Sequence, residues 1–456
     1  MIGSQSLTEL AQNLNGRLIG AETRFSRVSI DTRTIQPDDL YVALEGARFD
    51  GNDFLPQAKA GGAGAALVSS SDESISLPQL LVPDTHHALG VIAAENRSRS
   101  GARIFALTGS QGKTTVKEMA AAILAAKGSC LHTKANLNNT IGVPLTLLQI
   151  DEPHEYAVIE MGANKAGEIA FSAGITKADI VMITNANDAH LEGFGSLQGI
   201  VQAKGEILDN LSPTKTAVLN GDDPNVGAWI ERAAPAQVVL FGYSGQNGNL
   251  DYYAREVRSE SAGQVSFTIV GPELEARISM SLPGQHNVVN AVAAAAAAHV
   301  AGAEHAHISA GLAGLAPVKG RLFPRLGISE SRLIDDTYNA SPGSFKAAID
   351  VLVSLPGEKF LLAGDMKELG AGSKQAHREI GEYARRQGVN QLWAVGDHCK
   401  EMVAGFGAQG RHFSDQQELI AACRSVAGKD VVFLVKGSRG SQMEVIALAL
   451  EQVGEQ

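Results

Sequence analysis

The sequence predicts an α/β protein of three domains, and three observations support this prediction. The chain has 456 residues, and a domain commonly holds about 150 residues. Hydrophobic residues make up 44% and charged residues 19% of the chain, a balance typical of folded proteins with buried cores. Glycine is abundant, with 49 residues against 15 prolines, and it favours tight turns between strands and helices. We place the domains at residues 1–99, 100–318 and 319–456.

The first domain is expected to be a small α/β unit. Four short apolar runs, VSIDTR, LYVAL, AALVSS and QLLVP, alternate with polar or helical stretches and are predicted strands. The segment at residues 94–103 is polar, basic and without apolar periodicity. We therefore predict that it is a linker to the second domain.

The second domain is expected to combine a mostly parallel sheet with an antiparallel subsheet. The runs RIFALTG, YAVIEMG, DIVMITN, TAVLNGDD and VVLFG are predicted strands. A helix is predicted from Lys113 to Gly128, with one apolar face. The runs DYYAREV, QVSFTIV and ARISMSLPG alternate in polarity, which is typical of antiparallel strands. The alanine-rich residues 291–303 follow as a predicted, closely packed helix.

The third domain repeats strand and helix, beginning near Lys319. This alternation predicts a Rossmann-like parallel sheet with helices on both faces, and ligands then bind at the carboxyl ends of the strands. Ser341 and Pro342 form an N-cap followed by a proline in the first helical turn. Asp415 and Glu418 form a capping-box pattern.

Charge and apolar content exclude several classes of function. The net charge is 38 − 49 = −11, which disfavours binding to nucleic acids or anionic membranes. The chain start lacks the basic and apolar regions of an export signal, and residues 291–303 are too short to span a bilayer. The three cysteines lack CxxC spacing, so we expect buried, inert thiols rather than a disulfide framework or a zinc site. A cytoplasmic protein without membrane insertion is expected.

Residues 108–115, TGSQGKTT, lie between a predicted strand and a predicted helix, the context of a phosphate-binding loop. Its glycines let backbone N–H groups approach an anion, and the helix N-terminus adds positive potential. Lys113 can reach the β- and γ-phosphates, and the Thr114 hydroxyl can bind Mg²⁺. Leu107 stands where the general pattern has glycine, so this is a shorter form of the loop. The predicted ATP-binding residues here are Gly109, Ser110, Gln111, Gly112, Lys113, Thr114 and Thr115.

Other motifs narrow the class of phosphate chemistry. A GTPase would carry an NKxD motif after a strand, but the nearest string, TKAD at residues 176–179, precedes its strand and is interpreted as a loop. Glu160 ends a predicted strand and could hold a metal ion, with a solvent-facing strand end as the alternative. His190 follows another strand and could complete a metal site, although a hydrogen-bonded loop histidine is an open alternative.

Lys204 falls within an apolar helical stripe. A buried ammonium is costly unless it is paired or chemically changed. The lysine could extend its amine to solvent, or lose its proton and take up CO₂ to form a carbamate that binds Mg²⁺. The stripe consists of Leu197, Ile200, Val201, Leu208 and Leu211.

With the phosphate loop, Glu160, His190 and Lys204 in this order, the whole sequence resembles the Mur ligase family, the ATP-dependent amide-forming enzymes of peptidoglycan synthesis. The resemblance implies ATP and two Mg²⁺ ions, with Lys204 carbamylated. The implied metal ligands are Thr114, Glu160, His190 and Lys204. The implied catalytic residues are Lys113, Lys204 and His190.

Further motifs extend the resemblance, although each alone could be a helix cap or a solvated strand end. Asn287 and Asn290 in GQHNVVNA would face the adenine, Arg321 would contact an ATP phosphate, and Asp336 would hold the ribose. Residues of the KANLNNT segment, and of a first domain that resembles a UDP-sugar-binding domain, would contact the acceptor. A guanidinium fork suits a substrate carboxylate, which makes Lys436 and Arg439 candidates for that contact. The substrate-binding candidates are Thr32, Arg33, Asn138, Asn139, Thr140, Asn339, Lys436 and Arg439.

One string discriminates within the family. DDTYNASP at residues 335–342 resembles the signature of the member that adds D-alanyl-D-alanine, although Ser341 stands where asparagine is usual. The resemblance implies ATP-dependent addition of this dipeptide to UDP-N-acetylmuramoyl-tripeptide through an acyl phosphate, by a monomer. The alternatives are a ligase that adds the third peptide residue, a folylpolyglutamate-synthase-like ligase, a P-loop ATPase that acts as a motor or regulator, and a non-catalytic UDP-sugar sensor.

Overall fold

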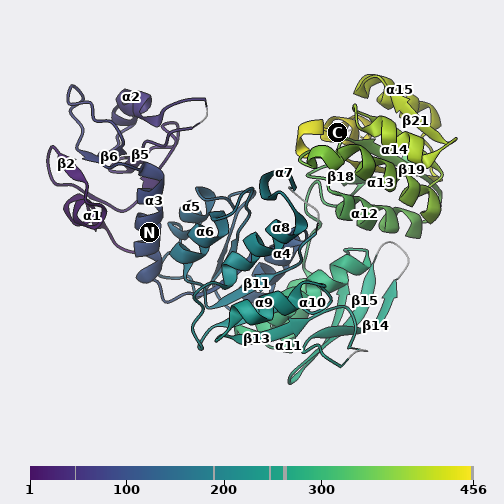
Figure 1. The fold of residues 1–456 in the computed structure, drawn as a ribbon, viewed down its shortest axis with the longest axis horizontal. Helices are drawn as coiled ribbons and strands as arrows, with labels where there is room; N and C mark the ends of the chain where they lie inside the picture. Colours follow the sequence, from purple (N-terminus) through teal and green to yellow (C-terminus); the bar gives the residue numbers. More distant parts are fainter. Residues whose placement is uncertain (47, 188–190, 246–247, 260–263, 453–456) are drawn as a thin grey trace. The chain divides into compact units, whose positions relative to one another are not determined.

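The computed structural model describes residues 1–46, 48–187, 191–245, 248–259 and 264–452 (Figure 1). Internal contacts group the chain into two units. One comprises residues 1–107, 127–163 and 167–181, and the other comprises residues 108–126, 164–166 and 182–456. The boundaries expected after residues 99 and 318 stay predictions. Every described helix is too short or too polar to cross a lipid bilayer.

The N-terminal segment forms the predicted small α/β unit. Its sheet has five strands in the order β2-β7-β6-β5-β4, parallel from β7 to β4 and antiparallel at the β2 edge. All four predicted strands are present. The helices here are α1 (Leu7–Leu14), α2 (Leu55–Ala60) and α3 (Thr85–Ser98). The strands are β1 (Gln5–Ser6), β2 (Arg17–Ile19), β3 (Arg24–Phe25), β4 (Val28–Ser29), β5 (Leu40–Val42), β6 (Ala65–Val68) and β7 (Gln79–Leu81).

The linker predicted at residues 94–103 is wrong. Helix α3 continues to Ser98, and strand β8 (Arg103–Thr108) begins at Arg103. The polar side chains that suggested a linker make tertiary contacts instead: buried Asn96 donates to the carbonyl of Leu147 at 2.8 Å. Polarity in this helix therefore reflects buried hydrogen bonding and not a solvated connection.

A six-stranded sheet in the order β13-β12-β11-β8-β10-β9 carries the centre of the chain. The pairings of β10 with β8 and β9, and of β12 with β13, are parallel. A separate sheet, β14-β15-β16, is antiparallel, so the predicted combination of sheets is confirmed. The strands are β9 (Cys130–His132), β10 (Tyr156–Glu160), β11 (Ile180–Ile183), β12 (Thr216–Asn220), β13 (Gln237–Phe241), β14 (Tyr253–Ser259), β15 (Val265–Gly271) and β16 (Leu274–Met280).

The alanine-rich run forms most of α10 (Gln285–Val300), which packs against α4 (Lys113–Ala125). Its small side chains, fully buried from Ala293 to Ala298, allow this close approach. Helix α4 ends at Ala125, before the predicted end at Gly128. The other central helices are α5 (Gly142–Leu147), α6 (Glu168–Thr176), α7 (Leu191–Phe194), α8 (Leu197–Gly205), α9 (Val226–Ala233) and α11 (His305–Ala313).

The C-terminal sheet has the order β17-β18-β22-β19-β20-β21, and all its pairings are parallel except β17 with β18. Alternate strand residues face opposite layers: Leu361 packs with helices α12 to α14, whereas Leu362 packs with α15 and α16. This is the predicted Rossmann-like arrangement. The strands are β17 (Phe323–Leu326), β18 (Arg332–Asp336), β19 (Glu358–Gly364), β20 (Gln391–Val395), β21 (Gly410–Phe413) and β22 (Val431–Lys436). The helices are α12 (Pro342–Ser354), α13 (Ser373–Gln387), α14 (Cys399–Phe406), α15 (Gln416–Val426) and α16 (Glu444–Leu450).

Both predicted helix caps are present. Ser341 accepts the N–H of Ser344 before Pro342 opens α12, and Asp415 accepts the N–H of Glu418 at 2.9 Å. The Glu418 carboxylate accepts from Ser414 and not from Asp415, so the reciprocal half of that capping box is displaced by one residue.

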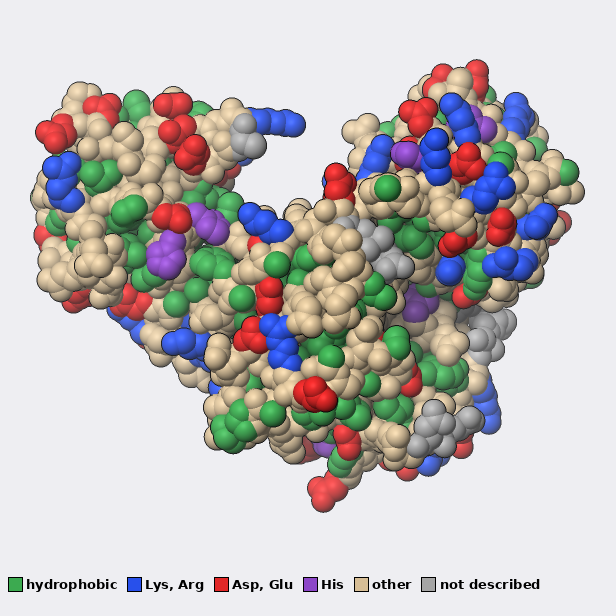
Figure 2. Space-filling model, viewed as in Figure 1, with side chains coloured by type: hydrophobic (Ala, Val, Ile, Leu, Met, Phe, Trp, Pro, Cys, Tyr) green, Lys and Arg blue, Asp and Glu red, His purple; other side chains and the backbone are tan. Residues whose placement is uncertain are grey.

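The predicted burial of the thiols is found at two of the three cysteines. Cys399 and Cys423 are buried and Cys130 is partly buried, all without a disulfide. Burial raises the pKa of Cys130 and of Cys423 to about 12, which leaves these thiols protonated and unreactive at neutral pH. Figure 2 shows acidic and basic side chains interspersed on the face in view.

Candidate active site

The phosphate loop follows β8 and ends at the N-terminus of α4, as predicted. Gly112 is the N-cap, with a φ of +79° that favours glycine. A Cβ at this position would lie 2.5 Å from Oδ1 of Asn290. At Gly109, a Cβ would collide with Oγ1 of Thr184. Both glycines are therefore required by close contacts with neighbouring segments.

The segment after β11 holds this loop in shape. Gln111 donates its N–H to Oδ1 of Asn185 at 2.9 Å, and Thr184 Oγ1 donates to the Gln111 carbonyl at 2.6 Å. Ser110 donates its N–H to the Asn185 carbonyl at 3.0 Å. Thr184 and Asn185 were not predicted from the sequence. Their position could have indicated them, because polar residues directly after a buried strand belong to the ligand edge of a parallel sheet.

Two cations contact the loop at different atoms. The Lys113 ammonium donates to the carbonyls of Gly109 at 2.6 Å and Ser110 at 3.4 Å. Arg321 donates from Nη2 to Oγ1 of Thr114 at 2.9 Å. Thr115 lies half-buried on the first turn of α4. The structure thus brings together Lys113, Thr114 and Arg321, three of the residues predicted to bind ATP.

The two predicted adenine-side residues lie on the first turns of α10. Asn287 is buried and donates to the Pro283 carbonyl at 2.8 Å. Asn290 donates to Oδ1 of Asn287 at 3.4 Å and lies against Gly112. Asn287 therefore makes a local bond at the start of α10 but is not its cap, which is Gly284 without a side-chain bond, while Asn290 contacts the phosphate loop.

Glu160 ends the interior strand β10 and is only 1% exposed. The solvent-facing alternative for this residue is therefore wrong. Its Oε1 accepts from Nδ2 of Asn138 at 2.8 Å, and its N–H donates to Oγ1 of Thr133 at 3.0 Å. Asn138, predicted to contact substrate, thus orients this carboxylate in the structure. Asn139 Oδ1 accepts the N–H groups of Ile141 and Gly142 at the start of α5.

Lys204 lies on α8 and is 2% exposed. The interpretation in which it extends to solvent is therefore wrong. Its ammonium nitrogen lies 5.4 Å from the ring centroid of Phe194, a distance within the range of cation–π contacts. Carbamylation of Lys204 stays a hypothesis. His190, the other predicted ligand of this metal site, lies outside the described residues.

The N-terminal substrate candidates lie in the turn after β4. Arg33 is exposed and forms an ion pair with Asp31 at 2.6 Å, and Thr32 is half-buried beside it. The hydrogen bonds from Arg33 lower the pKa of Asp31 to about 2. The Thr140 carbonyl accepts a hydrogen bond from Nε2 of His86 at 3.0 Å, and the contact of Thr140 with substrate stays a prediction.

Lys436 differs from its prediction. We expected its amine to hold a substrate carboxylate, but the residue is 2% exposed. Its ammonium donates to Oδ2 of Asp336 at 2.6 Å and to the Asn339 carbonyl at 3.0 Å. The physical reason is topological: β22 lies between β18 and β19, so the last residue of this interior strand is covered. Arg439, three residues later, is exposed.

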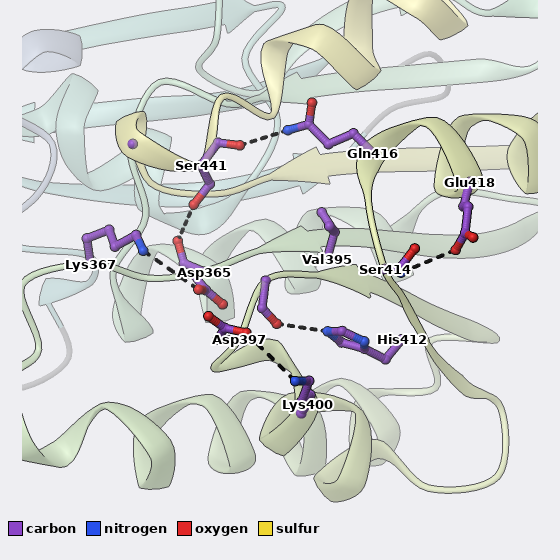
Figure 3. A pocket seen from close by; sticks show the side chains of 12 residues that line it. Asp365, Lys367, Val395, Asp397, Lys400, His412, Ser414, Gln416, Glu418 and Ser441 are labelled. Atoms are coloured by element: carbon purple, nitrogen blue, oxygen red, sulfur yellow. Dashed lines mark hydrogen bonds and ion pairs between the residues drawn. The ribbon is translucent and has the colours of Figure 1, made fainter.

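A pocket of about 850 Å³ opens at the carboxyl ends of β19, β20, β21 and β22 (Figure 3). Lys367 Nζ lies 3.8 Å from Asp365, and Lys400 Nζ lies 3.7 Å from Asp397. Both distances exceed a normal hydrogen bond, and the two lysine side chains are 53% and 64% exposed. These ammonium groups are therefore accessible to an anion. The charged and ionisable residues of the wall are Asp365, Lys367, Asp397, Lys400, His412 and Glu418.

Asp365 forms a fixed wall of this pocket. Its carbonyl accepts from Oγ of Ser438 at 2.7 Å and of Ser441 at 2.8 Å. Its carboxylate accepts the N–H groups of His398 and Cys399 at the start of α14, where a helix dipole favours negative charge. Near this pocket, the residues predicted from the sequence were Lys436 and Arg439, a few positions before Ser441, whereas Asp397 and Lys400 were missed.

His377 lies beneath the pocket, near Asp365 and Cys399. These three could form a metal-binding group by proximity. However, the Met366 N–H donates to Nε2 of His377 at 2.9 Å, and Nδ1 bonds the Ser373 carbonyl at 2.7 Å. Both ring nitrogens thus hold the loop between β19 and α13, and burial lowers the pKa of His377. The cluster is a structural support for the pocket.

Comparisons with known proteins match the chain along most of its length. Residues 24–97 match the Mur ligase family catalytic domain, 107–298 the Mur ligase middle domain, and 320–439 the Mur ligase glutamate ligase domain. The UDP-N-acetylmuramoyl-tripeptide--D-alanyl-D-alanine ligase of Escherichia coli strain K12 is 44% identical over 99% of both chains. A crystal structure of MurF from Acinetobacter baumannii is similar with a TM-score of 0.91 and 34% identity, covering 97% and 98% of the two chains. MurF of Thermotoga maritima in complex with ADP has a TM-score of 0.83 and 27% identity, covering 93% and 96%.

Proposed function

The chain belongs to the Mur ligase family, and we propose that it is an ATP-dependent ligase that adds D-alanyl-D-alanine to UDP-N-acetylmuramoyl-tripeptide. The observation that carries this proposal is the phosphate loop, where the Lys113 ammonium bonds loop carbonyls and Arg321 bonds the Thr114 hydroxyl at the N-terminus of α4. The similarity to ligases of this specificity supports the choice of substrates. The proposal includes a cytoplasmic monomer with no nucleic-acid partner, and functional domains at residues 1–99, 100–318 and 319–456.

The chemistry explains why cations gather at the loop. A carboxylate is a poor electrophile, so an oxygen of the acceptor carboxylate attacks the γ-phosphorus of ATP, and ADP leaves. The neutral amine of the dipeptide then attacks the carbonyl carbon of the acyl phosphate, phosphate leaves, and the amine loses a proton. The first step brings two anions together, which requires positive charge at the transferred group. Lys113 and Arg321 supply it.

The donor groups also fit Mg²⁺. The Thr114 hydroxyl and the Glu160 carboxylate are oxygen ligands, the type that Mg²⁺ prefers, and Asn138 fixes the orientation of Glu160. We propose them for one ion, and His190 with carbamylated Lys204 for a second. Bound Mg²⁺ would neutralise phosphate charge during transfer. Asn287, Asn290 and Asp336 are proposed for the adenine and ribose of ATP.

The strand-end pocket is our proposed site for the dipeptide. Its carboxylate would bind the Lys400 ammonium, with Lys367 beside it, because both amines are exposed and only loosely held by their acidic neighbours. Arg439 and Asn339, both exposed, stay candidates for contacts with the substrates. Thr32 and Arg33 are proposed for the UDP moiety, and Asn139 and Thr140 for the acceptor peptide.

One experiment separates this proposal from its alternatives. We expect ADP release only when ATP, the UDP-tripeptide and D-alanyl-D-alanine are all present, and a product mass equal to the two substrates minus water. A motor or regulator would release ADP without either substrate, and a UDP-sugar sensor would release none. A product formed with a single amino acid, or with glutamate and a folate, would instead indicate another ligase of this fold.

A further inference from the structure

The buried ion pair between Lys436 and Asp336 lies at the carboxyl edge of the C-terminal sheet. The two residues are register partners at the ends of the parallel strands β22 and β18, and their charged atoms are 2.6 Å apart. Lys436 also donates to the Asn339 carbonyl, and its ammonium lies 5.5 Å from the Phe345 ring centroid. The side chain is thus surrounded by the β18 end, the loop that follows it and α12.

The pair is linked to the phosphate loop through Arg321. The second carboxylate oxygen of Asp336 accepts the N–H of Leu322, the residue directly after Arg321, at 3.1 Å. On the other side, Tyr338 donates its N–H to the Gly320 carbonyl at 3.0 Å. The Tyr338 ring lies 4.3 Å from the Arg321 guanidinium carbon. The backbone on both sides of Arg321 is therefore fixed to the segment that Lys436 and Asp336 hold.

We propose that Lys436 is a positioning residue for the nucleotide, acting through Asp336 and the 337–339 segment to hold Arg321 toward the Thr114 hydroxyl. This inference rests on the proposed function, since it assigns Lys436 to the ATP side of that reaction. It replaces the expectation that Lys436 binds a substrate carboxylate. The two roles make opposite demands on the side chain: a carboxylate binder must be accessible, whereas a positioning group must be buried and bonded within the protein, as Lys436 is.

Loss of the Lys436 ammonium would affect Arg321 indirectly, through Asp336. Removing one partner leaves the other charge buried without compensation. The Asp336 carboxylate would then turn toward water or another donor, and its bond to the Leu322 N–H would weaken. Arg321 would lose its fixed direction, and nucleotide affinity would fall. The exposed dipeptide pocket, whose lysines make none of these bonds, would keep its affinity.

The test compares Lys436→Met and Lys436→Arg with the exposed control Lys429→Met in the full-length enzyme. ADP affinity is measured by calorimetry with Mg²⁺ and without turnover, and KM is measured separately for ATP and for D-alanyl-D-alanine. For Lys436→Met we expect the ADP Kd and the ATP KM to rise about tenfold, as for a lost charge-assisted bond, with the dipeptide KM changed by less than about twofold. Lys436→Arg should restore part of the ADP affinity because it keeps the charge.

A rise in the dipeptide KM with unchanged ADP Kd would overturn the inference and support the carboxylate-binding role. A fall in the kcat of Lys436→Met with both KM values and the ADP Kd unchanged would also overturn the inference, since that pattern reports only a smaller folded fraction. If Lys436→Met does not fold, Lys436→Gln carries the same test: its amide is uncharged, so the Asp336 charge is still uncompensated and the ADP Kd should still rise, while the polar amide favours folding at this site. Wild-type protein that binds ADP but forms no peptide bond would reject the proposed function, and the ADP measurements would still decide the role of Lys436.

Discussion

The phosphate loop and the strand-end pocket are built in opposite ways. The loop is one run of consecutive residues, 108–115, shaped by glycines and by backbone bonds such as Ser110 to Asn185. The pocket draws side chains from the ends of four strands, between Asp365 and Ser441. Lys113 bonds the Gly109 carbonyl of its own loop at 2.6 Å, whereas Lys400 lies 3.7 Å from Asp397. A local backbone site tolerates little change, while a site of dispersed, loosely held side chains can change its ligand preference residue by residue.

The largest expected effect tests the loop. Lys113→Ala removes the ammonium at the transferred phosphate, and we expect kcat for ligation to fall by about a thousandfold, as when a preorganised electrostatic group is lost. ADP release in the presence of both substrates measures this. The matched control is Lys127→Ala, an exposed residue just past the same helix, which should keep full activity. If Lys113→Ala ligates at the wild-type rate, the loop is not the nucleotide site.

The second effect tests whether Lys204 acts as a carbamate. Lys204→Ala should lower kcat by about a hundredfold, the upper range for lost metal-site support. Short carboxylates such as acetate or propionate should restore part of the activity, because they can replace the carbamate as a ligand. The same carboxylates should leave Lys113→Ala inactive, which makes that variant the control for nonspecific activation. Wild-type turnover in Lys204→Ala would contradict the carbamate hypothesis.

The contrast between the two sites also explains what the sequence could predict. The loop was predictable because its glycines, Lys113 and Thr114 are adjacent, and strand and helix patterns flank them. The fold class followed from periodicity. Helical spacing placed Lys204 in an apolar stripe but left open whether its amine is buried or reaches solvent. Local patterns contain this information because backbone conformation and helix faces depend on neighbouring residues.

The predictions were wrong where tertiary contacts determine whether a side chain is buried or where a helix ends. Lys436 looked like an exposed strand end, but its burial depends on β22 lying inside the sheet, and strand order is not contained in local spacing. The helix through residues 94–98 was missed because Asn96 is polar for a tertiary reason. Lys400 and Asp397 carried only a weak signal, since a polar residue after a strand can face any side until the neighbouring strands are known.

The third effect tests the pocket. Lys400→Met should raise the KM for D-alanyl-D-alanine by about tenfold, because one charge-assisted contact to its carboxylate is lost, while the ATP KM stays unchanged. Added salt should raise the wild-type dipeptide KM as well, since this contact is exposed and therefore screened. Lys429→Met, which removes an exposed charge outside the pocket wall, is the control. An unchanged dipeptide KM in Lys400→Met would place the dipeptide carboxylate elsewhere.

The smallest expected effect is a pH dependence of stability that arises from His377, which lies beside Asp365 of the pocket wall. Burial lowers the pKa of His377 from its ordinary 6.5; Asp365 and the Ser373 carbonyl oppose this shift, and His398 and Lys367 add to it. Below pH 6.5 the unfolded chain therefore binds a proton that the folded chain excludes, so stability falls as the pH falls. For one titrating group, the free energy of unfolding can change by at most about 1.4 kcal/mol per pH unit. Urea unfolding at pH 7.5 and 5.5 should show a smaller pH dependence in His377→Gln than in wild type, by about 1 kcal/mol.

His377→Gln also shows where acid acts. If the histidine supports only the pocket loop, through the Met366 N–H and the Ser373 carbonyl, then lowering the pH from 7.5 to 5.5 should raise the wild-type dipeptide KM more than the ATP KM. The variant should lose this difference, because its amide does not titrate. Equal changes in both KM values would mean that acid loosens the phosphate loop as well. The two sites would then share one acid-sensitive support.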